Sequence, residues 1–175
     1  MKRAASTVLI LIAAATSARR AGAQEAIYVV RHAEATGQSI VRRTEPAGQP
    51  ADPPLSTDGI GRSYKLRDML ADAGITQIYT STLRRTIETA APLGAARRVT
   101  SVQIAAADTT ALAARLAALG PRDRALVVGH SNTVPALLRA LGVDAAIAIA
   151  DDEYDNLFVV VPQKGAPPVL IRLRY

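Results

Sequence analysis

The chain of 175 residues contains no cysteine and no tryptophan, and it has only one phenylalanine and five tyrosines. Without cysteine it can form no disulfide and can carry no lipid on a thiol, so a packed apolar core must supply its stability. Nucleic-acid binders combine basic stripes with aromatic side chains on which bases stack. The few, scattered aromatic residues therefore argue against a nucleic-acid partner.

The first 23 residues have the pattern of a secretory signal peptide. Lys2-Arg3 form a basic start, residues 4–15 are apolar but too few to span a bilayer, and Ala21-Gly22-Ala23 fits the small-x-small cleavage rule. We expect cleavage near Ala23 and a periplasmic or secreted protein. Its mature domain, residues 24–175, is expected to contain no membrane span.

Arg19-Arg20 lie between the apolar stretch and the cleavage site, which is unusual for such a signal. The alternative is an N-terminal membrane anchor that is retained. Cleavage would remove four basic residues and no acidic one, and the formal charge would fall from +6 to +2. Most of the apparent basicity belongs to the signal peptide.

The mature part alternates short apolar runs with helical patterns, which predicts an α/β domain with a largely parallel sheet. Strands are expected at residues 26–30, 75–80, 97–104, 124–128, 156–161 and 169–173, the last two as a closing pair of edge strands. Helices are expected after the caps Ser56 or Thr57, Ser81, and Ser131 or Asn132, and at residues 109–119.

Both histidines of the chain directly follow an apolar run. Arg31-His32-Ala33-Glu34 comes after residues 26–30, and His130 comes after residues 125–129. Open α/β sheets bind ligands outside the carboxyl ends of their strands, so two neighbouring strands would bring these imidazoles together. Residues 35–54, which include Arg42 and Arg43, predict a long loop that acts as a lid or binding loop.

Five residues form the candidate site: Arg31, His32, Glu34, Arg85 and His130. An arginine fork matches phosphate oxygens, and two forks near helix N-terminal amides describe a dianion site. A neutral imidazole can attack phosphorus, and a second histidine, protonated, can stabilise the transferring group. These residue types are the ones that phosphoryl transfer without a metal needs.

Four segments resemble the motifs of the histidine phosphatase superfamily, the phosphoglycerate-mutase-like proteins of branch 1. Arg31-His32-Ala33-Glu34 resembles its Arg-His-Gly-Glu signature, and Leu55-Ser56-Thr57-Asp58-Gly59 resembles its Leu-Thr-x-x-Gly element. Residues 81–90 are similar to its Ser-x-x-x-Arg-x-x-x-Thr-Ala element, and Gly129-His130-Ser131-Asn132 to its Gly-His segment. The resemblance covers residues 26 to about 140 in the same order.

The resemblance implies a three-layer sandwich, with a mostly parallel central sheet and helices on both faces. It implies that His32 is the nucleophile and that Arg31, Arg85 and His130 hold the phosphate, with no metal and no cofactor. Asn132 and Glu34 are expected to contact a small phosphorylated substrate, and Glu34 more specifically to orient an arginine.

The family's general acid usually lies between the Thr-Ala element and the second histidine. That stretch offers Asp108 and Asp123. Asp108 precedes a predicted helix and could face the site, and the alternative is that it only caps the helix. Asp123, in a turn between two arginines, is interpreted as a solvated charge.

Several further residues have a plain structural interpretation. Asp151-Asp152-Glu153-Tyr154-Asp155 is interpreted as a solvated acidic turn, with Asp155 able to reach the pocket rim. Thr89 is interpreted as a packing residue and Arg84 as a surface charge. A zinc site on His32, Glu34 and His130 is disfavoured by the two neighbouring arginines.

The sequence thus predicts a metal-independent phosphatase that hydrolyses a phosphomonoester or phosphoanhydride through a phosphohistidine on His32. A non-catalytic, exported protein that binds a phosphorylated ligand is the alternative, and a phosphoglycerate-type mutase is disfavoured by the short chain. The shortness resembles the small phosphatases that act on protein phosphohistidine. The export signal resembles the periplasmic branch that trims phosphate from lipopolysaccharide sugars.

Overall fold

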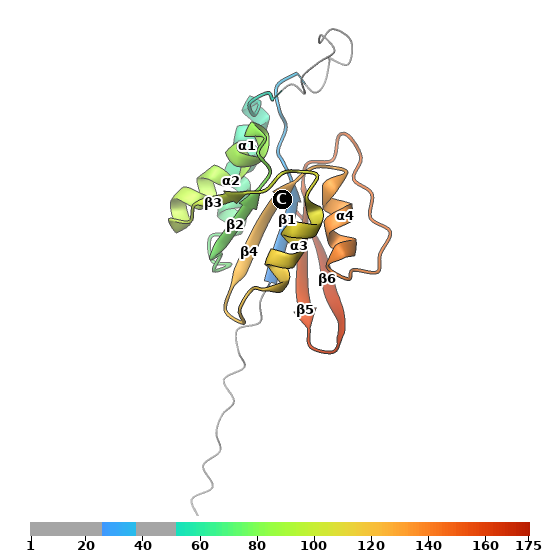
Figure 1. The fold of residues 1–175 in the computed structure, drawn as a ribbon. Helices are drawn as coiled ribbons and strands as arrows, with labels where there is room; N and C mark the ends of the chain where they lie inside the picture. Colours follow the sequence, from blue (N-terminus) through green and yellow to red (C-terminus); the bar gives the residue numbers. More distant parts are fainter. Residues whose placement is uncertain (1–25, 38–51) are drawn as a thin grey trace, which may run out of the picture.

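The structure is a computed structural model and describes residues 26–37 and 52–175. The signal peptide expected at residues 1–23 lies outside the described residues, as do Arg42 and Arg43 of the expected loop. In these described residues six strands form one sheet in the order β3-β2-β4-β1-β5-β6 (Figure 1). The strands are β1 Ala26–Arg31, β2 Gln77–Thr80, β3 Ser101–Gln103, β4 Arg124–Gly129, β5 Asn156–Gln163 and β6 Ala166–Arg174.

The sheet is mixed. β1, β2, β3 and β4 run parallel, whereas β5 pairs with β1 and β6 in antiparallel fashion. β1 and β4 are direct neighbours, and their register places Arg31 opposite Gly129. The predicted pairing of the two strands that precede the histidines is therefore confirmed. β5 is an inner strand, so the expectation that it lies at an edge is wrong, while β6 is an edge strand.

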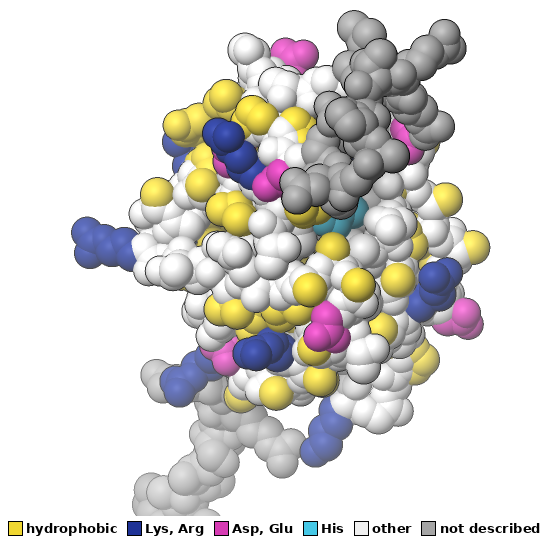
Figure 2. Space-filling view, turned by 45° about the horizontal axis from the view of Figure 1, so that its top comes forward, with side chains coloured by type: hydrophobic (Ala, Val, Ile, Leu, Met, Phe, Trp, Pro, Cys, Tyr) yellow, Lys and Arg dark blue, Asp and Glu magenta, His cyan; other side chains and the backbone are white. Residues whose placement is uncertain are grey.

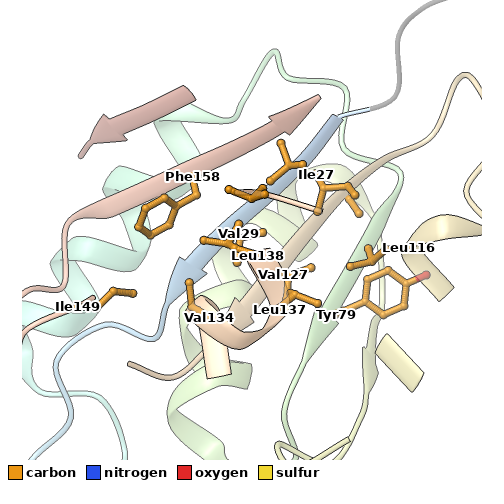
Figure 3. Close-up of a cluster of buried hydrophobic side chains, with 13 residues drawn as sticks. Ile27, Val29, Tyr79, Leu116, Val127, Val134, Leu137, Leu138, Ile149 and Phe158 are labelled. Carbon is orange, nitrogen blue, oxygen red and sulfur yellow. The ribbon is translucent and has the colours of Figure 1, made fainter. Parts of the chain in front are cut away.

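Within the described part of the chain, four helices cover the sheet: α1 Thr57–Met69, α2 Arg84–Arg97, α3 Thr109–Ala117 and α4 Thr133–Ala140. α3 and α4 pack on one face and α1 and α2 on the other (Figure 1). Two apolar clusters fill the two interfaces, one of them around Phe158, Val127 and Leu138 (Figure 3). The predicted three-layer α/β sandwich is confirmed. Among the described residues, none of the helices is long and apolar enough to cross a bilayer.

The segment that enters α1 fixes how this helix sits beside the end of β1. Ser56 caps the helix by accepting a hydrogen bond from the Gly59 amide at 3.1 Å, as predicted. The Ser56 amide in turn donates to the Glu34 backbone oxygen, and Ala35 forms an isolated bridge with Leu55. The two ends of the expected loop at residues 35–54 therefore lie side by side.

Candidate active site

A cavity of about 490 Å³ opens at the carboxyl ends of β1 and β4. Figure 2 turns the top of the molecule forward and shows histidine surface between the neighbouring side chains of this end. The lining comes from the two strand ends, the start of α2, the turn before α3, the start of α4 and the segment before β5. The lining residues are Arg31, His32, Leu83, Arg85, Ala106, Ala107, His130, Ser131, Asn132, Thr133 and Asp151.

His32 directly follows β1 and is 2% exposed. Its Nδ1 lies 2.7 Å from the backbone oxygen of Ala33. A carbonyl oxygen only accepts, so Nδ1 carries a proton and Nε2 of the neutral ring keeps its lone pair. Nε2 makes no hydrogen bond within the described part of the chain. It is the ring nitrogen available to an electrophile.

The Arg31 guanidinium is held from one side by the segment before β5. Its Nη1 donates to the backbone oxygens of Ala150, Asp151 and Glu153 at 2.8, 3.0 and 3.0 Å. Its Cζ also lies 4.0 Å from the centre of the Tyr154 ring, a cation–π contact. The Arg31 Nε is buried and has no partner among the described residues.

Arg85 lies in the first turn of α2, with a side chain that is 15% exposed. Its Nη1 lies 4.0 Å from a carboxylate oxygen of Asp52. Burial lowers the pKa of this guanidinium, and the charge of Asp52 opposes the shift. Within the described part of the chain the Arg85 Nε is also buried without an acceptor. The cavity therefore has two desolvated cationic donors that an anion would satisfy.

His130 follows β4, and its ring centre lies 5.3 Å from that of His32. The predicted convergence of the two histidines is thus present. The Nε2 of His130 lies 3.0 Å from the Ser81 hydroxyl. Ser81 was expected to cap α2, but α2 begins at Arg84, whose amide donates to Asp52 at 2.7 Å. Ser81 instead contacts the second histidine.

Both imidazoles are neutral at pH 7. Burial lowers the pKa of His32 to about 3, against the opposing hydrogen bond to Ala33. Burial also lowers the pKa of His130 to about 4. The positive charges of Arg85 and Arg31 push both pKa values in the same direction. His32 therefore has the protonation state of a nucleophile, whereas His130 is not the protonated group that the sequence predicted.

Asp108 does not line this cavity. It is exposed, and its carboxylate caps α3 by accepting a hydrogen bond from the Ala111 amide at 3.1 Å. Asp108 thus has the position of its alternative, a helix cap, and this placement does not support its role as general acid. The cap explains why an aspartate stands at this position, because the first amides of a helix have no hydrogen-bond partners within the helix.

Glu34 does not line the cavity either. It forms a two-pronged ion pair with Arg62 of α1, with N–O distances of 2.7 to 2.9 Å. Burial would raise the pKa of Glu34, but the hydrogen bonds and charge of Arg62 outweigh it and lower the pKa. Glu34 does orient an arginine, as expected, but that arginine is Arg62 and not a residue of the cavity. Substrate contact by Glu34 is therefore not supported.

Asn132 lines the cavity, as expected for a residue that contacts a substrate. It holds the N-cap position of α4, but its side chain makes no capping hydrogen bond. The Thr133 hydroxyl accepts a hydrogen bond from the His130 amide at 2.9 Å. The start of α4 thus fixes the backbone of His130 and leaves the Asn132 side chain at the cavity wall.

Asp151 and Asp152 form an exposed acidic turn before β5, as predicted, but the segment of residues 151–155 has a further role. Its backbone holds Arg31, as described above, and Asp151 lies in the cavity wall. Asp155, expected near the rim, pairs with Arg174 of β6 and is not part of the lining. Carbonyl oxygens carry no side-chain signal, so the composition of the segment did not reveal this role.

Thr89 does more than pack. Its buried hydroxyl accepts a hydrogen bond from the Ala33 amide at 2.9 Å and donates to the Arg85 backbone oxygen at 2.7 Å. It therefore ties the turn after His32 to the helix that carries Arg85. The spacing of Thr89 one turn after Arg85 was the available signal. Arg84 is exposed and pairs with Glu88, as expected for a surface charge.

The zinc alternative requires three ligands that lie close together. Among residues 26–37 and 52–175, no three His, Asp or Glu side chains lie close enough together to hold a metal ion. Glu34 is committed to Arg62, which removes the third ligand of the zinc alternative. Arg31 and Arg85 supply positive charge, which opposes a cation and favours an anion.

Several solved structures are similar to this fold. SixA of Agrobacterium tumefaciens, assigned as a phosphohistidine phosphatase, is 22% identical, with a TM-score of 0.60 over 86% of this chain and 98% of that one. The protein histidine phosphatase SixA in complex with tungstate is 17% identical, with a TM-score of 0.66 over 85% and 96%. The alpha-ribazole phosphatase of Shigella flexneri is 15% identical, with a TM-score of 0.66 over 86% and 96%.

At these identities the solved structures show a shared fold. No curated protein matches the chain in sequence. The family model of the histidine phosphatase superfamily (branch 1) matches residues 27–108, which contain the first histidine motif, the start of α1 and the Arg85 helix. The chain belongs to branch 1 of the histidine phosphatase superfamily.

Proposed function

We propose that this protein is a phosphatase that hydrolyses a phosphomonoester or phosphoanhydride through a phosphohistidine on His32. One observation carries the proposal: Arg31 and Arg85 line the cavity that both neutral imidazoles line, and the buried Nε atom of each has no acceptor within the described part of the chain. Unsatisfied cationic donors beside a nucleophile fit a phosphoryl group, whose oxygens accept and whose phosphorus is attacked.

In the first step the lone pair of His32 Nε2 attacks phosphorus, and the bond from phosphorus to the leaving oxygen breaks. The hydrogen bond from Nδ1 to the Ala33 oxygen holds the ring and stabilises the positive charge that develops on it. Arg31 and Arg85 neutralise the charge on the phosphoryl oxygens. In the second step water attacks phosphorus, the phosphorus–nitrogen bond breaks, and inorganic phosphate leaves.

The tungstate complex of SixA supports this pocket chemistry, because tungstate is a tetrahedral oxyanion like phosphate. In that relative the fold holds such an anion. The proposed substrate is accordingly a small phosphorylated compound whose leaving group is contacted by Asn132 and Asp151 of the cavity wall. With Asp108 placed on α3, Asp151 is the carboxylate within the described lining.

We also propose that the protein acts outside the cytoplasm, in the periplasm or after secretion. This proposal is supported by the composition of residues 1–23: the basic start, the short apolar stretch and the small residues at positions 21 and 23. N-terminal sequencing of the protein recovered from cells tests it. A mature chain that begins near residue 24 is expected, and a chain that retains residues 1–23 would favour the membrane anchor.

Hydrolysis of p-nitrophenyl phosphate by the purified mature chain in excess EDTA tests the main proposal. We expect turnover that survives the chelator and is lost in His32→Ala, because the nucleophile is the imidazole and no metal takes part. Arg84→Ala is the matched control, since it removes an exposed charge paired with Glu88.

The other outcomes distinguish the alternatives. Turnover that EDTA abolishes would replace the proposal with a metal-dependent reaction. Absence of turnover, together with binding of phosphate or tungstate, would favour the non-catalytic binding protein. If His32→Ala kept the activity of the parent chain, the assigned nucleophile would be wrong.

A further inference from the structure

Ser81 lies beneath the cavity wall, where two parallel strands end side by side. It follows β2, His130 follows β4, and the register pairs Thr80 with Val128. The Ser81 hydroxyl, in a residue that is 5% exposed, contacts three groups. It lies 3.0 Å from His130 Nε2 and 2.9 Å from the Thr86 hydroxyl, and it accepts a hydrogen bond from the Leu83 amide at 3.2 Å.

The hydrogen-bond donors in this cluster determine which ring nitrogen of His130 carries the proton. The Thr86 hydroxyl lies 2.8 Å from the Leu83 backbone oxygen, which can only accept. Two oxygens at that distance repel unless a proton lies between them, so Thr86 donates to Leu83. The Ser81–Thr86 contact then takes its proton from Ser81. The Ser81–His130 contact must take its proton from the imidazole.

This arrangement also agrees with the number of hydrogen bonds that the Ser81 hydroxyl can accept and donate. Ser81 Oγ accepts from the Leu83 amide and from His130 Nε2, and it donates to Thr86. In the opposite arrangement Ser81 donates to His130 and Thr86 donates to Ser81, which leaves the 2.8 Å contact with Leu83 without a proton. The first arrangement leaves only the longer contact of the Thr86 hydroxyl, 3.2 Å to the Ser81 backbone oxygen, without a proton of its own, so it satisfies more contacts than the opposite arrangement.

We propose that Ser81 is a positioning residue that holds His130 as the Nε2–H tautomer, which leaves the lone pair on Nδ1 and, because His130 lines the cavity, makes it the proton carrier of the reaction. The proposal rests on the proposed phosphatase function. It supplies the proton donor that Asp108, as a helix cap, does not. The two histidines are then opposite tautomers, since His32 carries its proton on Nδ1.

The proton balance of the first step follows from this assignment. The second pKa of a phosphomonoester is near 6, so at neutral pH part of the substrate enters as the monoanion, which carries one proton. Its proton passes to Nδ1 of the neutral His130. As His32 Nε2 forms its bond to phosphorus and the phosphorus–oxygen bond breaks, His130 Nδ1 gives the proton to the leaving oxygen. The products are a neutral alcohol and the phosphohistidine.

In the second step His130 first takes up a proton and then returns it. The attacking water gives a proton to Nδ1 of His130 as its oxygen bonds to phosphorus and the phosphorus–nitrogen bond to His32 breaks. His130 returns this proton to the phosphate, which leaves as the monoanion. Both histidines are again neutral, so no outside acid or base is consumed.

The surroundings of His130 are cationic on the cavity side. Arg31, Arg85 and the neutral His32 face it there, and Asp151 lies in the same cavity wall. On the side of α3, Asp108 borders a smaller cavity that His130 also lines. The positive charge of the two arginines disfavours a resident proton on His130. A bound phosphate neutralises that charge and allows the proton to move onto Nδ1.

Nitrogen NMR of histidine-labelled protein tests the tautomer without any assay of activity. The chain contains two histidines, so only four ring nitrogens give signals, and His32→Asn leaves those of His130 alone. At pH 7 we expect His130 to show a protonated Nε2 and an unprotonated Nδ1, and His32 to show the reverse. A proton on Nδ1 of His130 at pH 7 would overturn the proposal.

Kinetics test the role of Ser81. Ser81→Ala removes the hydroxyl, and we expect turnover of an alkyl phosphate to fall at least about tenfold more than turnover of p-nitrophenyl phosphate, because only the alkoxide needs a proton. Ser81→Thr keeps the hydroxyl and should restore the ratio. Equal losses on both substrates would overturn the proton-carrier role. If the parent chain turned over neither substrate, the proposed function would fail, while the NMR spectrum would still decide the tautomer.

Discussion

At the scale of single residues, the difference between Arg84 and Arg85 shows what places a charge in the site. The two are neighbours in the first turn of α2, about 100° apart around the helix. The Arg84 side chain is 58% exposed and pairs with Glu88, whereas that of Arg85 is 15% exposed and lines the cavity. The same residue type therefore serves the surface at one position and the anion pocket at the next.

Arg85→Ala should lower kcat/KM for p-nitrophenyl phosphate by about two to three orders of magnitude, because it removes a desolvated donor to the phosphoryl oxygens in the transition state. Arg84→Ala is the matched control and should change the rate by less than about threefold, as expected for an exposed ion pair. Steady-state kinetics of both variants check this. Similar rates for the two variants would mean that Arg85 is not part of the phosphate pocket.

At the scale of elements, the approach of α1 to the end of β1 depends on a single glycine. A Cβ at Gly59 would lie 2.0 Å from the backbone oxygen of Glu34. Backbone cannot give way at that distance without moving the strand end that carries His32. The glycine of the Leu55–Gly59 motif is thus required by close packing of a helix N-terminus on the nucleophile's own segment.

Gly59→Ala should destabilise the protein by about 2 kcal/mol or more through this clash, and it should also lower turnover because Glu34 lies two residues after His32. Gly61→Ala, on the same helix, is the control, since no heavy atom lies within 4 Å of its added Cβ. It should raise the stability by up to about 1 kcal/mol through the better helix propensity of alanine. Urea unfolding measures both, and equal effects would contradict the close approach.

The sequence predicted the order of strands and helices because apolar periodicity and caps are local signals. It also predicted that His32 and His130 converge, since parallel strands end at one edge of a sheet. It did not predict that β5 is internal, because strand order depends on long-range packing. The faces of helices were also beyond it: Ile60 and Tyr64 of α1 are about half exposed, whereas Leu66 and Leu70 are buried.

The sequence predicted the site residues whose side-chain type indicates their chemistry. It missed the roles that depend on where a residue lies in the fold. Arg31, Arg85 and the histidines have residue types that only a few functions require. The carboxylate of Asp108 suits either a general acid or a helix cap, and in the structure it caps α3. The carbonyl oxygens that hold Arg31 leave no trace in the sequence.

At the scale of the whole molecule, the site places two titratable rings and two arginines inside a domain that no disulfide reinforces. The histidines are buried in their neutral form, which suits a nucleophile at neutral pH. In the unfolded chain both would protonate near their ordinary pKa of about 6.5. The arrangement that serves the reaction therefore makes the fold sensitive to acid.

The lowered pKa values of the histidines set the direction in which the free energy of unfolding changes with pH, and the pH range of that change. Because the folded pKa values are lowered to about 3 for His32 and about 4 for His130, the unfolded chain binds more protons below pH 6.5 and stability falls as the pH falls. Between pH 7 and pH 5 each histidine should cost about 2 kcal/mol of the free energy of unfolding. Carboxylates with lowered pKa values, such as Glu34, contribute their losses only below that window.

Urea unfolding at pH 7 and pH 5 measures the loss, and His130→Gln is the informative variant because it removes one of the two rings. We expect this variant to lose about half as much stability as the parent chain over the same interval, whatever its stability at pH 7. Saturating phosphate should reduce the loss in the parent chain, since an anion bound between the arginines stabilises protonated histidine. A parent chain equally stable at both pH values would show that its histidines are not buried in the neutral form.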